Sequence, residues 1–164
     1  MTQSPCPASD SLKSVLVVHP QLLIREAICH MLCHAGFRTL GHAPPVQALD
    51  QLAAKPTPDI ILLYWVLPDG GADVIRALAE EFRHSIIIIL TYHQPPGAIL
   101  AGIRAGASGF LSLNVSPKEF TNSLHRIASG AGTISPDMTV NLLRTLVCNG
   151  HRELFTKILR DLAK

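Results

Sequence analysis

Five polar or aromatic residues stand at or beside the ends of three apolar runs: His19, Tyr64, Trp65, Thr91 and Tyr92. The carboxyl ends of parallel strands meet at one edge of a sheet, so we expect these side chains to gather there as a pocket. Close packing favours bulky side chains that fill a cavity, and the alternative is a site for a small ligand or a partner peptide. They contain no nucleophile–base pair and no metal cluster, so we predict that the chain is not an enzyme.

Cys29, His30, Cys33 and His34 have the residue types of a metal site. Each like pair lies one helical turn apart, but the cysteine and histidine pairs point about 100° apart around a helix. A tetrahedral site would need further ligands from elsewhere in the fold. We therefore favour a plain helix surface, predict no metal and no other cofactor, and expect the four cysteines to be free thiols.

The composition is that of a protein with a well-buried core. Hydrophobic residues make up 48% of the 164 residues and charged residues 16%, which argues against disorder. The formal net charge of +2 is too small to indicate nucleic-acid binding by itself. No apolar run approaches the roughly 20 residues of a membrane helix, and the start lacks the apolar stretch of a signal peptide. We predict a cytoplasmic protein with no membrane contact.

Apolar runs and helical patterns alternate five times. The runs predict strands at residues 13–18, 38–42, 60–67, 86–90 and 109–113. Apolar spacing predicts helices at residues 22–34, 46–54, 73–82, 97–105 and 117–130. Right-handed crossovers then give a doubly wound, three-layer α/β sandwich with a five-stranded parallel sheet. We choose the flavodoxin-like order 2-1-3-4-5. No Gly-rich loop follows the first strand, which disfavours nucleotide binding.

Local signals add detail to two helices. Ser116 as N-cap, Pro117 at the first position and Glu119 at the third predict a firm helix start. Helical spacing predicts that the first helix buries Ile24, Ala27, Ile28, Met31 and Ala35.

The two ends of the chain differ from its middle in composition and in apolar pattern. Residues 1–12 are rich in Ser and Pro and are predicted to form a mobile tail, whereas residues 13–130 form the main domain. Residues 131–164 are predicted to form a helical extension, with Asn149 and Gly150 between two helices. This helical hairpin either caps the domain or pairs with another copy.

Several stretches of the chain match one known family: 15–28, 58–63, 67–68, 90–91, 105–111, 116–119 and 134–136. On these stretches the chain resembles the receiver domain of bacterial two-component response regulators. The resemblance covers about residues 13–138 and is strongest to receivers that precede a helix-turn-helix DNA-binding domain.

The resemblance implies a phosphorylation site whose residues have changed here. In the family, an acidic pair holds Mg²⁺, an Asp takes a phosphoryl group from a histidine kinase, and a Lys contacts the phosphoryl oxygens. The acidic pair falls on His19 and Pro20, the phosphoacceptor on Tyr64 and the lysine on Leu113. A phenol with a pKa of about 10 is a poor acceptor, and the other three positions offer neither carboxylate nor charge. We therefore expect no phosphorylation and no Mg²⁺.

Two family positions keep their residue type, namely Thr91 after the fourth strand and the aromatic Phe110 on the fifth. In the family the Thr contacts phosphoryl oxygens and the aromatic residue reorients on activation. Without phosphate, we expect Phe110 to be a fixed core or interface residue. Asp69, one position after Pro68, is interpreted as a turn aspartate rather than a substitute acceptor.

The helix at residues 97–105 carries little charge, and part of its surface must face away from the sheet. We predict that an interface for self-association or for a partner lies there and on the fifth strand. The candidate residues are Ile99, Leu100, Ile103 and Phe110.

The favoured function is that of a degenerate receiver, or pseudo-receiver, which acts without phosphorylation as a module for protein interaction or homodimerisation in signalling or transcriptional control. One alternative is a truncated or fragmentary DNA-binding regulator, which would reach DNA only through a missing output domain or one supplied by a partner. A second alternative is a small-ligand sensor that uses the aromatic pocket.

Overall fold

The sheet has five parallel strands. The computed structural model describes residues 12–43, 56–65, 71–92 and 96–130. Their strand order is β2-β1-β3-β4-β5, which confirms the predicted flavodoxin-like fold class. The strands are β1 (Ser14–Val18), β2 (Arg38–Ala43), β3 (Ile60–Tyr64), β4 (Ile86–Thr91) and β5 (Gly109–Ser112). The prediction that the central strand continues to residue 67 is wrong, because β3 ends at Tyr64.

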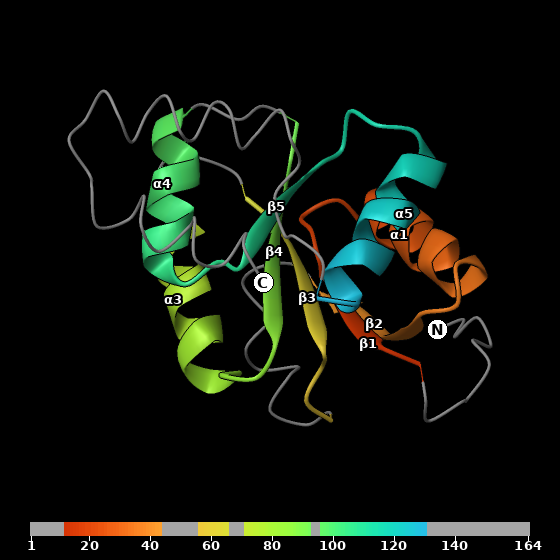
Figure 1. Cartoon of the computed structure of the whole chain (residues 1–164), viewed down its shortest axis with the longest axis horizontal. Coiled ribbons are helices and arrows are strands. Elements are labelled where there is room, and N and C mark those ends of the chain that lie inside the picture. Colours follow the sequence, from red (N-terminus) through yellow and green to blue (C-terminus); the bar gives the residue numbers. More distant parts are fainter. Residues whose placement is uncertain (1–11, 44–55, 66–70, 93–95, 131–164) are drawn as a thin grey trace.

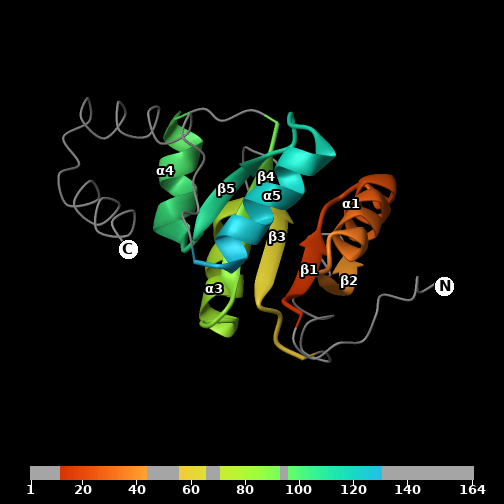
Figure 2. The same cartoon turned by 45° about the vertical axis from the view of Figure 1, so that its right-hand side comes forward.

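Helices cover both faces of this sheet. In the described residues they are α1 (Leu22–His34), α3 (Gly71–Glu81), α4 (Pro96–Ala105) and α5 (Pro117–Ala128). Figure 1 shows α3 and α4 on one face and α1 and α5 on the other, and Figure 2 shows the same layers from a second angle. This is the three-layer arrangement expected when each parallel strand returns through a helix.

The hydrophobic core has two halves, one on each side of the sheet. Successive side chains of a strand point to opposite faces, so Leu16 and Val18 join the half under α3 and α4, while Val15 and Val17 join the half under α1 and α5. Both faces are covered, which is why β1, β3 and β4 consist of continuous apolar runs rather than alternating patterns.

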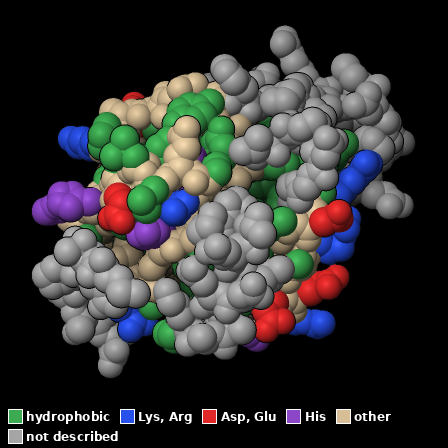
Figure 3. Space-filling view, turned by 180° about the vertical axis from the view of Figure 1, so that it is seen from behind, with side chains coloured by type: hydrophobic (Ala, Val, Ile, Leu, Met, Phe, Trp, Pro, Cys, Tyr) green, Lys and Arg blue, Asp and Glu red, His purple; other side chains and the backbone are tan. Residues whose placement is uncertain are grey.

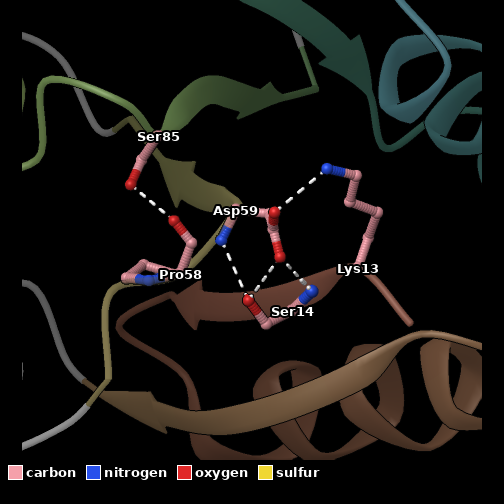
Figure 4. A network of polar contacts seen from close by, with 5 residues as sticks. All are labelled: Lys13, Ser14, Pro58, Asp59 and Ser85. Carbon is pink, nitrogen blue, oxygen red and sulfur yellow. Dashed lines mark hydrogen bonds and ion pairs between the residues drawn. The ribbon is translucent and has the colours of Figure 1, made fainter. Parts of the chain in front are cut away.

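The amino ends of three strands are fastened by a polar network (Figure 4). The Asp59 carboxylate accepts hydrogen bonds from the Ser14 backbone N–H at 2.8 Å and hydroxyl at 2.7 Å, and pairs with Lys13 Nζ at 3.0 Å. The Ser85 hydroxyl donates to the Pro58 carbonyl at 2.6 Å. Hydrogen bonds from Ser14, followed by those from Lys13, lower the pKa of Asp59 to about 2. The network ties β1, β3 and β4 together at the edge where they begin.

The start of α5 matches its sequence signal. The Ser116 hydroxyl accepts from the Glu119 backbone N–H at 3.3 Å, and the Glu119 carboxylate accepts from the Ser116 backbone N–H at 2.9 Å. This reciprocal capping box, with Pro117 at the first helical position, confirms the predicted helix start.

The buried face of α1 follows the prediction at four of its five positions. Ile28 is buried and Ala27 is exposed, and the other predicted residues pack against the core half under α1 and α5: Ile24, Met31 and Ala35. The prediction missed two further buried side chains, Leu32 and Arg25. Apolar spacing does not predict a buried arginine, and Arg25 is buried because protein atoms accept its N–H groups.

Several expectations fall outside the described residues. These are the tail at 1–11, the helix at 46–54, the segment at 66–70 with Asp69, and the extension at 131–164. Among the helices that the structure does describe, none has the length and apolar character to cross a membrane.

Candidate functional site at the carboxyl edge of the sheet

Three aromatic rings meet at the carboxyl edge, which we define as the edge where the parallel strands end. His19 follows β1, Tyr64 is the last residue of β3, and Tyr92 follows β4. The ring centroids of His19 and Tyr64 lie 4.3 Å apart, and those of Tyr64 and Tyr92 lie 5.9 Å apart. The structure thus brings together three of the five residues predicted to form a pocket.

Trp65 lies on the other face of the sheet. Its indole is buried in the half of the core under α3 and α4, whereas Tyr64 packs against the half under α1 and α5. Adjacent residues at the end of β3 point to opposite faces, and this separates them. A single pocket that contains both Trp65 and Tyr64 was therefore a wrong prediction.

Thr91 ends β4, and Leu113 directly follows the neighbouring strand β5 at the same edge. Thr91, the last residue of β4, pairs in register with Ser112, and its carbonyl accepts from the Leu113 N–H at 2.9 Å. The side chain of Leu113, at the position that the resemblance assigns to the family lysine, is partly buried against the core under α1 and α5. An apolar side chain at this position adds to the core and supplies no charge to the edge.

His19 is a buried, neutral imidazole. Its side chain is only 1% exposed, and its Nδ1 accepts a hydrogen bond from the Gln21 backbone N–H at 3.0 Å. The proton of the neutral ring is therefore on Nε2, which has no hydrogen-bond partner among the described residues. Burial lowers the pKa of His19 from its ordinary value of 6.5, and the nearby Arg25 charge lowers it further.

Arg25 places a positive charge under the loop that follows β1. Its side chain is 8% exposed and donates hydrogen bonds to the carbonyls of His19 and Pro20 and, at 3.2 Å, to Nδ1 of His42. His42 Nε2 in turn lies 3.1 Å from Glu26 Oε1. Sequence reasoning missed Arg25, although an arginine one turn into the first helix was a visible signal.

The described residues at this edge do not fit Mg²⁺. That ion binds carboxylate, carbonyl and water oxygens in near-octahedral geometry. The positions that the resemblance assigns to the acidic pair hold His19, whose N–H is a donor, and Pro20, which has no polar side-chain atom. The carbonyls of both residues already accept from the Arg25 cation. The positive charge of Arg25 and the types of ligand atom at these two positions both disfavour a divalent cation there.

The predicted interface on α4 and β5 is largely core. Ile99, Leu100 and Phe110 are between 1% and 6% exposed, and only Ile103 is partly buried. These side chains cannot form the exposed surface that we predicted. The apolar stripe of α4 faces the sheet, and the exposed residues of this helix include Ala101 and Arg104.

The large exposed hydrophobic side chains of the described residues lie elsewhere, at the carboxyl edge. Leu22 and Leu23 begin α1 and are 57% and 81% exposed. Tyr92 follows β4 and Val115 precedes α5, and both are exposed to a lesser degree. Sequence reasoning missed this group, because the apolar pattern of α1 alone does not tell which leucines face solvent.

Comparison with known proteins places these features in a family. A model of the response regulator receiver domain matches residues 15–125. The phosphate regulon transcriptional regulatory protein PhoB of Escherichia coli K12 is 33% identical over 127 residues, which cover 76% of this chain and 54% of that protein. The transcriptional regulatory protein UhpA of the same organism is 25% identical over 143 residues, which cover 82% of this chain and 70% of that protein.

Solved structures give the same fold. A LuxR-family two-component response regulator from Aurantimonas sp. SI85-9A1 aligns with a TM-score of 0.72 at 25% identity, covering 84% of this chain and 99% of that one. A LuxR-family DNA-binding response regulator from Silicibacter pomeroyi aligns with a TM-score of 0.65 at 27% identity, covering 76% and 98%. This chain spans about half the length of the PhoB proteins that it matches. The match over residues 15–125, together with the sheet order, establishes that the chain belongs to the response regulator receiver family.

Proposed function

We propose that this receiver works without phosphorylation, as a protein-interaction module in two-component signalling or transcriptional control. The observation that carries the proposal is the contact between the Tyr64 ring, at the phosphoacceptor position, and the buried ring of His19, at an acidic-pair position. These rings, 4.3 Å apart, fill the space between two positions where phosphoryl transfer needs a carboxylate nucleophile and a bound cation.

Four positions of the family's phosphoryl-transfer site carry residues without its chemistry, and Thr91 alone of the chemical positions keeps its family type. Tyr64 offers a phenol instead of a carboxylate, and Leu113 offers a partly buried apolar side chain instead of an ammonium group. The Arg25 charge lies beside the loop where a divalent cation would have to bind. The proposal therefore assigns the chain neither catalysis nor Mg²⁺, and it assigns the protein to the cytoplasm, where two-component signalling takes place.

The exposed apolar group at the carboxyl edge supports a role in protein contact. Leu22, Leu23, Tyr92 and Val115 come from three separate loops or helix starts at this edge. Large apolar side chains exposed at one edge are candidates for contact with another protein, and a contiguous patch of them would mark a binding surface. We assign this group to a protein partner or to a second copy of the chain, in place of the buried residues of α4.

An NMR titration of the labelled chain with Mg²⁺ and beryllofluoride, which mimics a phosphoryl group on aspartate, tests the proposal. We expect no saturable shifts of the Tyr64, Thr91 or Phe110 amides. A variant with His19→Asp, Pro20→Asp, Tyr64→Asp and Leu113→Lys is the positive control for reagent and fold. Saturable shifts in the unaltered chain that reach Phe110 would refute phosphorylation-independent action.

One observation favours a second candidate function. PhoB and UhpA are transcriptional regulatory proteins, and this chain corresponds to 54% and 70% of their lengths. The chain would then act as the receiver part of a DNA-binding regulator, with its output through a further domain or through a partner. The test is retention of the purified chain on immobilised genomic DNA fragments at physiological salt. Retention would favour direct binding of DNA by this chain, and elution at that salt would mean that DNA contact is made by a partner.

A further inference from the structure

Two exposed histidines form a close pair on α1. His30 and His34 lie one helical turn apart, both side chains are exposed, and their ring centroids are 4.5 Å apart at 68° between planes. Histidine side chains project from the edge of the surface in Figure 3, on the side of the molecule that carries α1 in Figure 1. Neither side chain takes part in the site at the carboxyl edge.

Paired imidazoles on one helix face have the chemistry of a metal chelate. The neutral imidazole is a strong ligand for Cu²⁺, Ni²⁺ and Zn²⁺, and the i, i+4 spacing directs two such ligands to the same side of a helix. The helix fixes this spacing before binding, so little conformational freedom is lost when an ion binds. The sequence alone favours a plain helix surface here. Because the two rings lie close together, we propose instead that His30 and His34 form a two-ligand chelating site for a divalent transition-metal cation, bound in the order of affinity Cu²⁺ above Ni²⁺ and Zn²⁺.

The position of the pair on the helix favours a cation. His34 is the last residue of α1, where the helix dipole places partial negative charge. Arg25, the basic residue of the first turns, is turned into the protein toward the carbonyls of His19 and Pro20. A cation at the end of α1 therefore gains from the dipole and avoids that arginine.

The site is incomplete within the part of the chain that the structure describes. No group of three or more His, Cys, Asp or Glu side chains there is arranged to hold a metal ion. Two imidazoles therefore supply half of a four-coordinate shell, and water or donor groups of a bound partner fill the open positions. The expected affinity is modest, and the inference stands independently of the proposed interaction function.

Calorimetric titration of the whole chain with CuCl₂ and with NiCl₂ measures the site. We expect the variants His30→Ala and His34→Ala each to bind Ni²⁺ about tenfold or more weakly, because a lost ligand removes at least about 1.4 kcal/mol. His84→Ala, which removes an exposed histidine between α3 and β4, is the matched control and should bind as the unaltered chain does. Circular dichroism without metal verifies that all variants fold.

Electron paramagnetic resonance of the Cu²⁺ complex gives a second readout. The spectrum of the unaltered chain should show two nitrogen ligands, and the spectrum of either His30→Ala or His34→Ala should show one. The inference is overturned if the unaltered chain binds no Ni²⁺ or Cu²⁺. It is equally overturned if the double variant His30→Ala/His34→Ala binds as tightly as the unaltered chain, because the ion would then be bound by other residues.

Discussion

Gly102 of α4 has no room for a Cβ atom against the core, and replacing it with alanine tests how tightly this region is packed. A Cβ built at Gly102 would lie 2.8 Å from side-chain atoms of Trp65, Ile89 and Phe110. Ordinary van der Waals contact begins at 3.4 Å, so the neighbours or α4 must move by 0.6 Å (3.4 minus 2.8 Å). Three buried side chains meet the new atom at once, so no single rotamer change relieves the contact.

Two opposing effects set the size of the change. Alanine in place of glycine stabilises a helix interior by about 1 kcal/mol. Overpacking a close-packed core costs about 1–3 kcal/mol. Because three contacts are violated together, we expect the Gly102→Ala variant to lose about 1–2 kcal/mol of unfolding free energy.

The assay is urea unfolding followed by circular dichroism. Trp65 is the single tryptophan of the chain, so its fluorescence also reports directly on this contact in Gly102→Ala. In a Trp65→Leu background, which removes one of the three clashing side chains, the same substitution should cost about 1 kcal/mol less. Ala101→Gly, at an exposed position of α4, is the control and should show only the helix-propensity loss, with no coupling to Trp65. Stabilisation by Gly102→Ala, or no coupling with Trp65, would refute the close approach of α4.

Three further substitutions probe other parts of the structure. Asp59→Asn should cost about 1 kcal/mol at neutral pH, a reduced value because the carboxylate is 39% exposed. The folded-state pKa of about 2 lies below the ordinary 3.8, so this stability is present above pH 3.8 and is lost as pH falls through 2. Urea midpoints of both proteins across this range should converge, and a constant gap would contradict the pKa. Arg25→Met should cost about 2 kcal/mol in urea unfolding, because it leaves the carbonyls of His19 and Pro20 without a donor, and an unchanged midpoint would contradict this role. Leu23→Glu should change stability by no more than about 0.5 kcal/mol but weaken association in sedimentation or pull-down, and equal binding by the variant would exclude Leu23 from the interface.

The strand pattern was accessible from the sequence because burial on both faces leaves a direct signature. The runs at Val15 and Ile86 could be read as buried parallel strands without any contact information. The start of α5 was equally accessible, because a capping box is made by residues three positions apart. The altered family positions, such as Tyr64, followed from residue identity alone once the resemblance was recognised.

Burial of individual side chains was less accessible. The low charge of α4 suggested an exposed apolar surface, but Ile99 and Leu100 are core residues. Hydrophobicity is the same whether a side chain faces solvent, a partner or the sheet, and only the packing of α4 decides. The burial of Arg25 was missed for the opposite reason. A charged side chain is expected to be exposed, but Arg25 is buried because the folded loop brings carbonyl groups to it.

The sequence by itself determined the order of strands and helices along the chain, the capping of α5 and the residue types at the positions that the resemblance assigns to the phosphorylation site, because these depend on residue identity and on neighbours close along the chain. Tertiary structure alone decided which residues meet. It separated Tyr64 from Trp65 across the sheet, joined Lys13 to Asp59 and set the contact of Gly102 with Phe110. The physical reason is that side-chain contacts between distant segments depend on the rotation and approach of each element, and these are set only when the whole core packs.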